Sequence, residues 1–326
     1  MSPSWISTQH IDPVKQGDGS QTPPKSFLSQ RTKRFWISIC VLLLIITIGL
    51  GVGLGVGLTQ GNGSGGSASS EPSPPLGNNT NTTAGTYWKP AAGTPWQIVL
   101  QYALNDTSVD VPVYDIDLFT NPKSTIDNLH SMNRSVICYF SAGSYEDFRP
   151  DSSNFTKDDY AKPLKGWPGE YWLNTNSSNV RSIMSSRLAL AASKGCDGVD
   201  PDNVDGYDND SGIDLTTDTA INYLTFLTIE AHALNMSIGL KNAGAIVNAT
   251  VEMLQWEVNE QCGQYGECED FRPFIDAGKP VFRIEYPNST PEVSTATVQS
   301  ICNNTEAEGF STVIKNMSLD DWVDSC

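Results

Sequence analysis

The sequence is poor in residues and motifs that bind metals, nucleotides or nucleic acids. Its 326 residues include three histidines and no C-x-x-C pair, so there is no basis for a zinc site. No glycine-rich dinucleotide or phosphate loop follows any predicted strand. Lysine and arginine total 20 against 37 aspartates and glutamates, and a formal net charge of −17 argues against nucleic acid. We therefore expect no metal, no cofactor and no nucleic-acid partner.

The negative charge lies outside the N-terminal tail. The five basic residues before the apolar run are opposed there by two aspartates, which leaves −20 for the rest of the chain. Such a surface favours a cationic or neutral ligand. The alternative interpretation is that the charge only keeps a secreted protein soluble.

An apolar run near the N-terminus divides the chain into four segments. Residues 1–34 are polar and typical of a disordered cytosolic tail. Residues 35–58 carry no charge, are long enough to span a bilayer and directly follow basic residues. Residues 59–87 are rich in Gly, Ser, Asn, Thr and Pro, which predicts a flexible stalk. We therefore expect a single-pass type II protein of the cell membrane with residues 88–326 outside the cell; a cleaved signal peptide is the alternative.

Six of the seven cysteines follow the apolar run, and an even number in an extracellular chain suggests disulfides. Short spacing favours pairing of Cys262 with Cys268, and Cys302 can reach the terminal Cys326. Cys138 and Cys196 then remain. Several N-x-S/T sequons, among them Asn105, Asn154, Asn235 and Asn316, indicate passage through the secretory pathway and a glycoprotein.

From residue 96 onward, short apolar runs alternate with segments of helical period. Helices are expected at 180–193 and 217–234. Strands that alternate with helices predict a parallel sheet. Eight such units in about 240 residues predict an α/β fold of the (β/α)8 or TIM-barrel type, preceded by the transmembrane helix. The expected strands are 96–100, 113–118, 135–140, 198–200, 237–242, 256–259, 280–285 and 311–315.

Polar side chains gather where these strands end, which is where the active sites of such barrels lie. A single polar strand end means little, but the same pattern recurs from the second to the seventh strand. Aromatic residues nearby, Trp172 and Tyr139 among them, could stack on sugar rings, although ordinary packing is the more common role of each of them. The polar strand ends include Asp115, Asp117, Tyr139, Asp200, Asp202, Asn203, Lys241, Asn242, Glu260 and Glu285.

Three acids, Asp200, Asp202 and Asp205, crowd into six positions after the fourth strand. Carboxylates this close need a bound cation, a shared catalytic proton or solvent exposure. A calcium loop is disfavoured because Val204 stands where a ligand is needed. Two carboxylates facing each other across a barrel end could instead hydrolyse a glycosidic bond, with Glu260 as the second acid. The residues alone do not rank Asp200 against Asp202.

Five motifs, in this order, resemble those of glycoside hydrolase family 114, the fungal and bacterial endo-α-1,4-polygalactosaminidase-like (β/α)8 barrels. The resemblance covers about residue 88 to the C-terminus. An anchor and stalk before the barrel are similar to the membrane-anchored fungal members that act in galactosaminogalactan metabolism. The motifs are ICYFSAGSYE (137–146), GCDGVDPDNVD (195–205), GLKNA (239–243), VNEQC (258–262) and GKPVFRIEY (278–286).

The resemblance implies a retaining endo-hydrolase that cuts α-1,4-linked galactosamine chains. The family's nucleophilic aspartate corresponds to Asp202 and its acid/base glutamate to Glu260. Residues that match further site positions, or that we expect to bind substrate beside the pair, are Asp115, Asp117, Tyr139, Asp200, Asn203, Asp205, Lys241, Asn242, Glu285 and Trp172.

A partly deacetylated galactosamine polymer is cationic, so an acidic surface would attract it. We therefore expect a monomer whose partners are this polysaccharide and the membrane. Two alternatives differ from this hypothesis. One is a non-catalytic protein that binds cell-wall polysaccharide, and the other is an endo-glycosidase with a different sugar specificity. The presence of both Asp202 and Glu260 speaks against the non-catalytic reading.

Overall fold

The structure is a computed structural model, and it describes residues 87–326. The predicted tail (1–34), membrane span (35–58) and nearly all of the stalk (59–87) lie outside the described residues. Within residues 87–326, no helix combines the length and the apolar character needed to cross a bilayer. The predicted anchor therefore stays a prediction.

Eight parallel strands pair in chain order, and a ninth, short strand follows them. The order is β1-β2-β3-β7-β8-β9-β10-β11-β12, with β12 antiparallel to β11. All eight expected strands are present, whereas β12 was not predicted. The strands are β1 (Trp96–Val99), β2 (Val113–Asp117), β3 (Ser135–Ser141), β7 (Gly198–Asp202), β8 (Ser237–Lys241), β9 (Trp256–Glu260), β10 (Val281–Glu285), β11 (Ser311–Lys315) and β12 (Val323–Ser325).

Side chains, not a backbone ladder, join the first strand to the eighth. The Trp96 Nε1 donates to the Ser311 carbonyl at 2.9 Å, and the Lys315 Nζ donates to Gln97 Oε1 at 3.0 Å. No β1–β11 strand pairing occurs within the described chain. The result is a barrel-like α/β fold with a nearly closed nine-stranded sheet, and we call the β1–β11 junction the seam.

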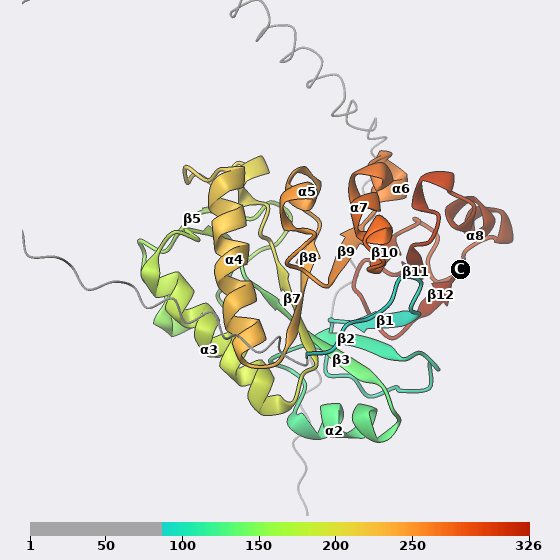
Figure 1. Ribbon diagram of the computed structural model, residues 1–326, viewed down its shortest axis with the longest axis horizontal. Coiled ribbons are helices and arrows are strands. Elements are labelled where there is room, and N and C mark those ends of the chain that lie inside the picture. The colour runs from blue at the N-terminus through green and yellow to red at the C-terminus, as the bar shows by residue number, and fades with distance from the viewer. Residues whose placement is uncertain (1–86) are drawn as a thin grey trace, which may run out of the picture. The chain divides into compact units, whose positions relative to one another are not determined.

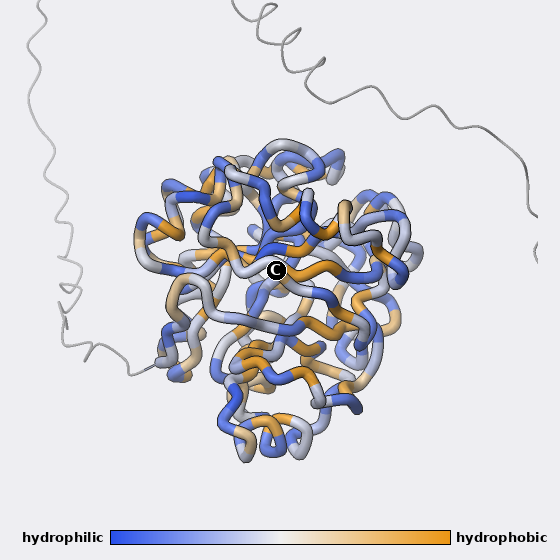
Figure 2. The backbone as a smooth tube through the Cα atoms, turned by 90° about the vertical axis from the view of Figure 1, so that its right-hand side faces the viewer, coloured by the Kyte–Doolittle hydropathy of each residue, from blue (hydrophilic) through white to orange (hydrophobic). Residues whose placement is uncertain are grey.

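Alternation along the strands sends one set of apolar side chains into the barrel, where Trp96, Trp256 and Phe282 belong to one buried cluster. A Cβ on Gly198 or on Gly239 would lie 2.3 or 2.0 Å from the Trp256 ring. Glycine at both positions therefore makes room for the indole. Figure 2 shows apolar residues in orange along the strands and hydrophilic residues in blue in many of the connecting loops.

Helices α3 (Ser178–Lys194) and α4 (Thr217–Ala233) pack against each other on the outer face of the sheet, with α4 against β8 (Figure 1). The Ser177 side chain caps α3, which ends at Gly195 with a φ of 93°. Thr216 caps α4. Both helices confirm sequence predictions. The other helices are α2 (Lys123–Ser131), α5 (Val247–Thr250), α6 (Cys262–Tyr265), α7 (Arg272–Asp276) and α8 (Thr295–Cys302).

A small antiparallel sheet, absent from the predicted fold, is inserted between β3 and α3. Its strands are β4 (Ser144–Glu146), β5 (Tyr160–Pro163) and β6 (Glu170–Leu173), in the order β4-β6-β5. Because it follows the carboxyl end of β3, the insertion lies at the end of the barrel where the polar strand ends gather.

The three expected disulfides are present. They join Cys138 to Cys196, Cys262 to Cys268 and Cys302 to Cys326, with Cα–Cα distances of 6.0, 4.7 and 5.3 Å. The first ties β3 to the turn between α3 and β7, the second closes a short loop that begins at α6, and the third ties α8 to the C-terminus.

Candidate active site

Three charged side chains end three neighbouring strands, and we call this end of the barrel the mouth. Asp202 ends β7, Lys241 ends β8 and Glu260 ends β9. The Lys241 Nζ lies 3.3 Å from Asp202 Oδ1 and 2.9 Å from Glu260 Oε2. Because both distances start at one nitrogen, these two carboxylate oxygens lie no more than about 6 Å apart. The mouth thus holds a lysine-bridged pair of carboxylates.

Each carboxylate of the pair is also held by hydroxyl or amide donors. The Tyr139 hydroxyl donates to Asp202 Oδ2 at 2.8 Å. The Tyr286 hydroxyl donates to Glu260 Oε1 at 2.6 Å, and the Asn242 Nδ2 donates to Glu260 Oε2 at 3.1 Å. These donors fix the direction in which the two carboxylates face.

Charge pairing outweighs burial at the mouth. Burial alone would raise the pKa of Glu260, but Lys241 and the hydrogen bonds from Tyr286 and Asn242 lower it below its ordinary value. Burial alone would lower the pKa of Lys241, but the charges of Asp202 and Glu260 raise it well above its ordinary value. In this arrangement Lys241 is charged and Glu260 is ionised.

A second pair of acids, Asp115 and Asp200, lies on the inward face of β2 and β7. Both are 0% exposed, and within the described residues no N–H group, hydroxyl or ammonium donates to their oxygens. Burial raises the pKa of Asp115 well above its ordinary value and that of Asp200 to about 7. One proton held on Asp115 and donated to Asp200 satisfies both groups. In the described part of the chain, no cluster of three or more His, Cys, Asp or Glu is placed to hold a metal ion.

The backbone takes an unusual turn directly after each of the three strands of the mouth. Asn203 (φ 62°), Asn242 (φ 53°) and Gln261 (φ 64°) are left-handed and follow Asp202, Lys241 and Glu260. Non-glycine residues in this region are uncommon and gather at functional sites. The Asn203 carbonyl also fits only against a glycine, because a Cβ on Gly143 would lie 1.7 Å from its oxygen.

The small sheet adds two acids to the mouth that sequence reasoning did not identify. Glu146 and Glu170 are register partners on β4 and β6, and both are buried. Burial raises the pKa of Glu170 to about 7 despite a 2.8 Å hydrogen bond from Ser144 Oγ, with the charges of Glu146 and Asp202 adding to the increase. The sequence feature that could have indicated these acids is the polar turn that begins at Ser141, the last residue of β3.

A hydrogen-bonded chain links Glu170 to Asp202. Ser144 Oγ lies 2.6 Å from Ser141 Oγ, which accepts from Asn203 Nδ2 at 2.9 Å, and the Asn203 N–H donates to Asp202 Oδ1 at 2.7 Å. Asp205 also lies near this chain; burial, with the Asp202 charge, raises its pKa to about 6. The predicted residues Asn203 and Asp205 therefore lie next to Asp202.

Three predicted site residues have other partners. Asp117 accepts from Arg149 Nη1 at 2.6 Å and from backbone N–H groups of the following turn. Glu285 faces away from the barrel interior, where its Oε1 accepts from Arg283 Nε and from the Gly263 N–H. Trp172 is 4% exposed and packs against Gly206. The structure thus brings together Tyr139, Asp202, Asn203, Asp205, Lys241, Asn242 and Glu260.

Two carboxylates at the ends of β7 and β9 of an α/β barrel, with Lys241 of β8 between them, form the arrangement of a glycoside hydrolase. Residues 77–326 match glycoside-hydrolase family GH114. The chain therefore belongs to this family, as its sequence motifs indicated, and is a glycoside hydrolase.

Solved structures agree with this assignment. The chain is similar to Aspergillus fumigatus Ega3, solved in complex with galactosamine, at 55% identity over 74% of this chain and 100% of that one, with a TM-score of 0.72. It shares the fold of the glycoside hydrolase domain of PelA from Pseudomonas aeruginosa at 10% identity, over 70% of this chain and 98% of that one, with a TM-score of 0.58. No curated protein sequence matches the chain.

Proposed function

We propose that the protein is an endo-acting hydrolase of α-1,4-galactosaminidic bonds in galactosamine-rich polysaccharide such as galactosaminogalactan. Asp202 is the nucleophile and Glu260 the acid/base. The observation that carries this proposal is the lysine-bridged pair at the mouth, because two acids this close are the machinery of glycosidic cleavage. The similarity to Ega3, which was solved with galactosamine bound, supports the choice of sugar.

The reaction proceeds in two steps. Asp202 attacks the anomeric carbon, while the bond to the leaving oxygen breaks and that oxygen takes a proton from Glu260. Water then attacks the anomeric carbon of the resulting ester, Glu260 takes a proton from this water, and Asp202 leaves as a carboxylate. Two inversions restore the starting anomer, so the enzyme is retaining.

The family resemblance favours the retaining course. Retaining enzymes place their carboxyl groups about 5–5.5 Å apart, whereas inverting enzymes need about 6.5–9.5 Å to admit a water. Lys241 holds one oxygen of each carboxyl group within about 6 Å of the other, which keeps both groups within reach of one anomeric centre.

Proton donation requires a change at Glu260 when substrate binds. The ionised Glu260, paired with Lys241, suits the second step, in which it is the base. The first step needs its protonated form, and the lowered pKa opposes this. We propose that the substrate displaces the Lys241 ammonium from Glu260, which removes the main cause of the lowered pKa.

The acids around the pair suit a cationic sugar. Glu170 and Asp205 lie close enough to Asp202 for its charge to raise their pKa values, whereas Glu146 is already paired with Arg149 at 2.8 Å. Among the described residues, Lys241 is the cation that contacts the carboxylate pair. An amine on the sugar would pair with Glu170 and Asp205, and a net charge of −17 would speed the encounter. The site is therefore acidic, as is the chain as a whole.

We also propose that the protein is a monomer anchored in the cell membrane by residues 35–58, with its catalytic domain outside the cell as a type II glycoprotein. Three disulfides in the described domain are consistent with an oxidising compartment. Asn105, Asn154 and Asn235 lie exposed in their sequons. Protease treatment of intact cells should remove the catalytic domain, and full protection would contradict this topology.

The test of function is direct. The purified full-length protein is incubated with a partly deacetylated α-1,4-galactosamine polymer, and new reducing ends and oligosaccharides are measured. A β-linked glucosamine polymer is the matched control for charge. NMR of the first product should show the α anomer. Absence of cleavage would refute the proposed function, and a β anomer would refute retention alone.

A further inference from the structure

The small sheet has a second face, opposite the one that carries Glu146 and Glu170. Tyr145 and Tyr171 are register partners on β4 and β6, directly beside that acidic pair in the sequence. Because side chains alternate along a strand, the tyrosines point away from the mouth. One small sheet thus separates the acidic mouth from an aromatic surface.

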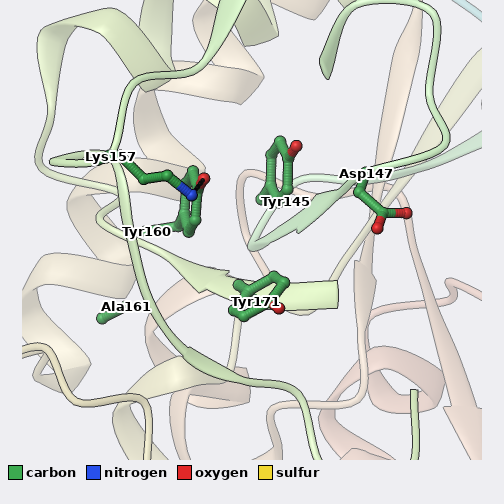
Figure 3. Close-up of a pocket in the computed structure, with 6 residues that line it drawn as sticks. All are labelled: Tyr145, Asp147, Lys157, Tyr160, Ala161 and Tyr171. Carbon is green, nitrogen blue, oxygen red and sulfur yellow. Dashed lines mark hydrogen bonds between the residues drawn. The ribbon is translucent and has the colours of Figure 1, made fainter. Parts of the chain in front are cut away.

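This outer surface is hollowed by a cleft of about 430 Å³, which we call the tyrosine cleft. Its volume lies in the range of small-molecule sites. Figure 3 shows Tyr145 between Tyr160 and Asp147, with Tyr171 below them. The lining residues are Tyr145, Asp147, Lys157, Tyr160, Ala161 and Tyr171.

The tyrosine rings are fixed against one another. Tyr145 and Tyr160 stack at 4.4 Å between centroids, with an interplanar angle of 7°. Tyr171 is tilted by 49° against Tyr160 at 5.5 Å. The Lys157 Nζ donates to the Tyr160 hydroxyl at 2.6 Å. Rings held in this way offer a preformed platform, so a ligand would not need to order them.

Two exposed aromatic residues lie on the segments next to the lining of the cleft. Phe148, next to Asp147, is 62% exposed, and Trp167, in the turn between β5 and β6, is 55% exposed. The Asp147 N–H donates to the Gly169 carbonyl of that turn at 3.1 Å, which holds these two segments together. Large apolar side chains left exposed on adjoining segments are a feature of binding surfaces.

The charge of the tyrosine cleft differs from that of the mouth. Asp147 and Lys157 both line it and both are exposed, so one negative and one positive group face the ligand. A balanced rim with phenol rings suits an uncharged sugar, whose C–H face packs on an aromatic ring while its hydroxyls bond to the charged rim. It does not favour a free amino sugar over a neutral one.

We propose that the tyrosine cleft is a second carbohydrate site, which binds uncharged pyranose residues, such as N-acetylated ones, of the polysaccharide cut at the mouth. The identity of the polymer rests on the proposed function, whereas the presence of the site rests on the geometry of the tyrosine cleft. Binding there would hold a long chain on the enzyme while the mouth acts on its cationic residues.

The test uses the full-length protein in the Asp202→Asn background, which keeps the polymer intact. Affinity is measured for a partly N-acetylated α-1,4-galactosamine polymer and for the fully deacetylated one. Tyr171→Ala should weaken binding of the N-acetylated polymer by roughly three- to tenfold and leave the deacetylated polymer unaffected. Tyr171→Phe keeps the ring and should bind like the parent. Ile229→Ala, at an exposed apolar residue of α4, is the control.

If Tyr171→Ala fails to fold, Asp147→Ala replaces it in the test. Asp147→Ala truncates an exposed side chain of the cleft and should weaken binding of the N-acetylated polymer to the same extent. Unchanged affinity in the folded variants would refute the second site, and an equal loss for the deacetylated polymer would refute its preference for uncharged residues. In the parent enzyme, which retains Asp202, failure to cleave either polymer would refute the proposed function. That outcome would leave the binding result unchanged.

Discussion

Two buried lysines end barrel strands in opposite electrostatic surroundings. Lys241 ends β8 at the mouth and contacts two carboxylates, Asp202 and Glu260. Lys315 ends β11 at the seam and donates to Gln97 Oε1 at 3.0 Å and to the Asp320 carbonyl at 2.6 Å. The first partners are charged and the second are neutral.

The pKa values of the two lysines follow this difference. Burial works to lower both. At Lys241 the carboxylates overcome burial and raise the pKa well above its ordinary value. At Lys315 burial prevails over the charges of Asp320 and Asp321, and the pKa falls to about 7. Burial alone therefore does not decide the charge of an inward-facing group; the charge of its partner does.

The largest effect should come from removing the nucleophile at the mouth. Asp202→Asn cannot form the glycosyl ester, so kcat/KM should fall on the order of 10³-fold or more. Asp208→Asn, at an exposed aspartate of the same loop, is the matched control and should keep parental activity. Reducing-end release measures both variants. Substantial activity in Asp202→Asn would overturn its assignment.

The next effect compares the two lysines directly. Lys241→Met leaves two mostly buried carboxylates without a cation and should cost about 3–5 kcal/mol of unfolding free energy at pH 7. Lys315→Met removes two hydrogen bonds but also the cost of burying an amine, so its effect should stay within about 2 kcal/mol of zero. Urea unfolding measures both. Equal losses would show that partner charge is not what separates these lysines.

Sequence patterns predicted most of the barrel because its strands are short apolar runs between helical segments. Eight strands, both long helices and three disulfides are present as expected. The small sheet was missed because its strands have only three or four residues, too few for an alternating pattern to stand out, and β5 is also largely exposed. β12 has the same character.

The site was harder to predict than the fold because a residue's role depends on where its side chain points and what it contacts, and not only on its place in the sequence. The alternation of Phe282, Glu285 and Tyr286 could have placed Glu285 on the outer face of β10, since Phe282 and Tyr286 point inward. By contrast, Asp117 points inward but is engaged by Arg149 from a loop 32 residues away, which no local pattern reveals. Glu170 was not predicted because it lies on β6 of the small sheet, which the sequence patterns did not indicate.

Lys315 at the seam should give stability a pH dependence between pH 7 and pH 9 that Lys241 at the mouth does not. The pKa of Lys315 is about 7 in the folded chain and ordinary, near 10.5, when unfolded. Between these values the unfolded state binds more protons, so this group's contribution makes stability rise with pH. The stability of the parent relative to Lys315→Met should therefore increase by about 2 kcal/mol from pH 7 to pH 9. Lys165→Met, at an exposed lysine, should show no such trend; the same trend there would refute the assignment.

The smallest effect concerns the fine adjustment of the mouth. Asn242 donates to Glu260 at 3.1 Å and helps to lower its pKa. Because activity requires protonated Glu260, kcat/KM should decline as pH rises above the pKa of that group. Asn242→Ala removes one donor, so the pKa should rise and the decline should move to higher pH by about half a unit. Thr297→Ala, on α8, should leave the profile unmoved. A shift to lower pH in Asn242→Ala would contradict the role of Glu260 as the proton donor, because loss of a hydrogen bond to the ionised form can only favour protonation.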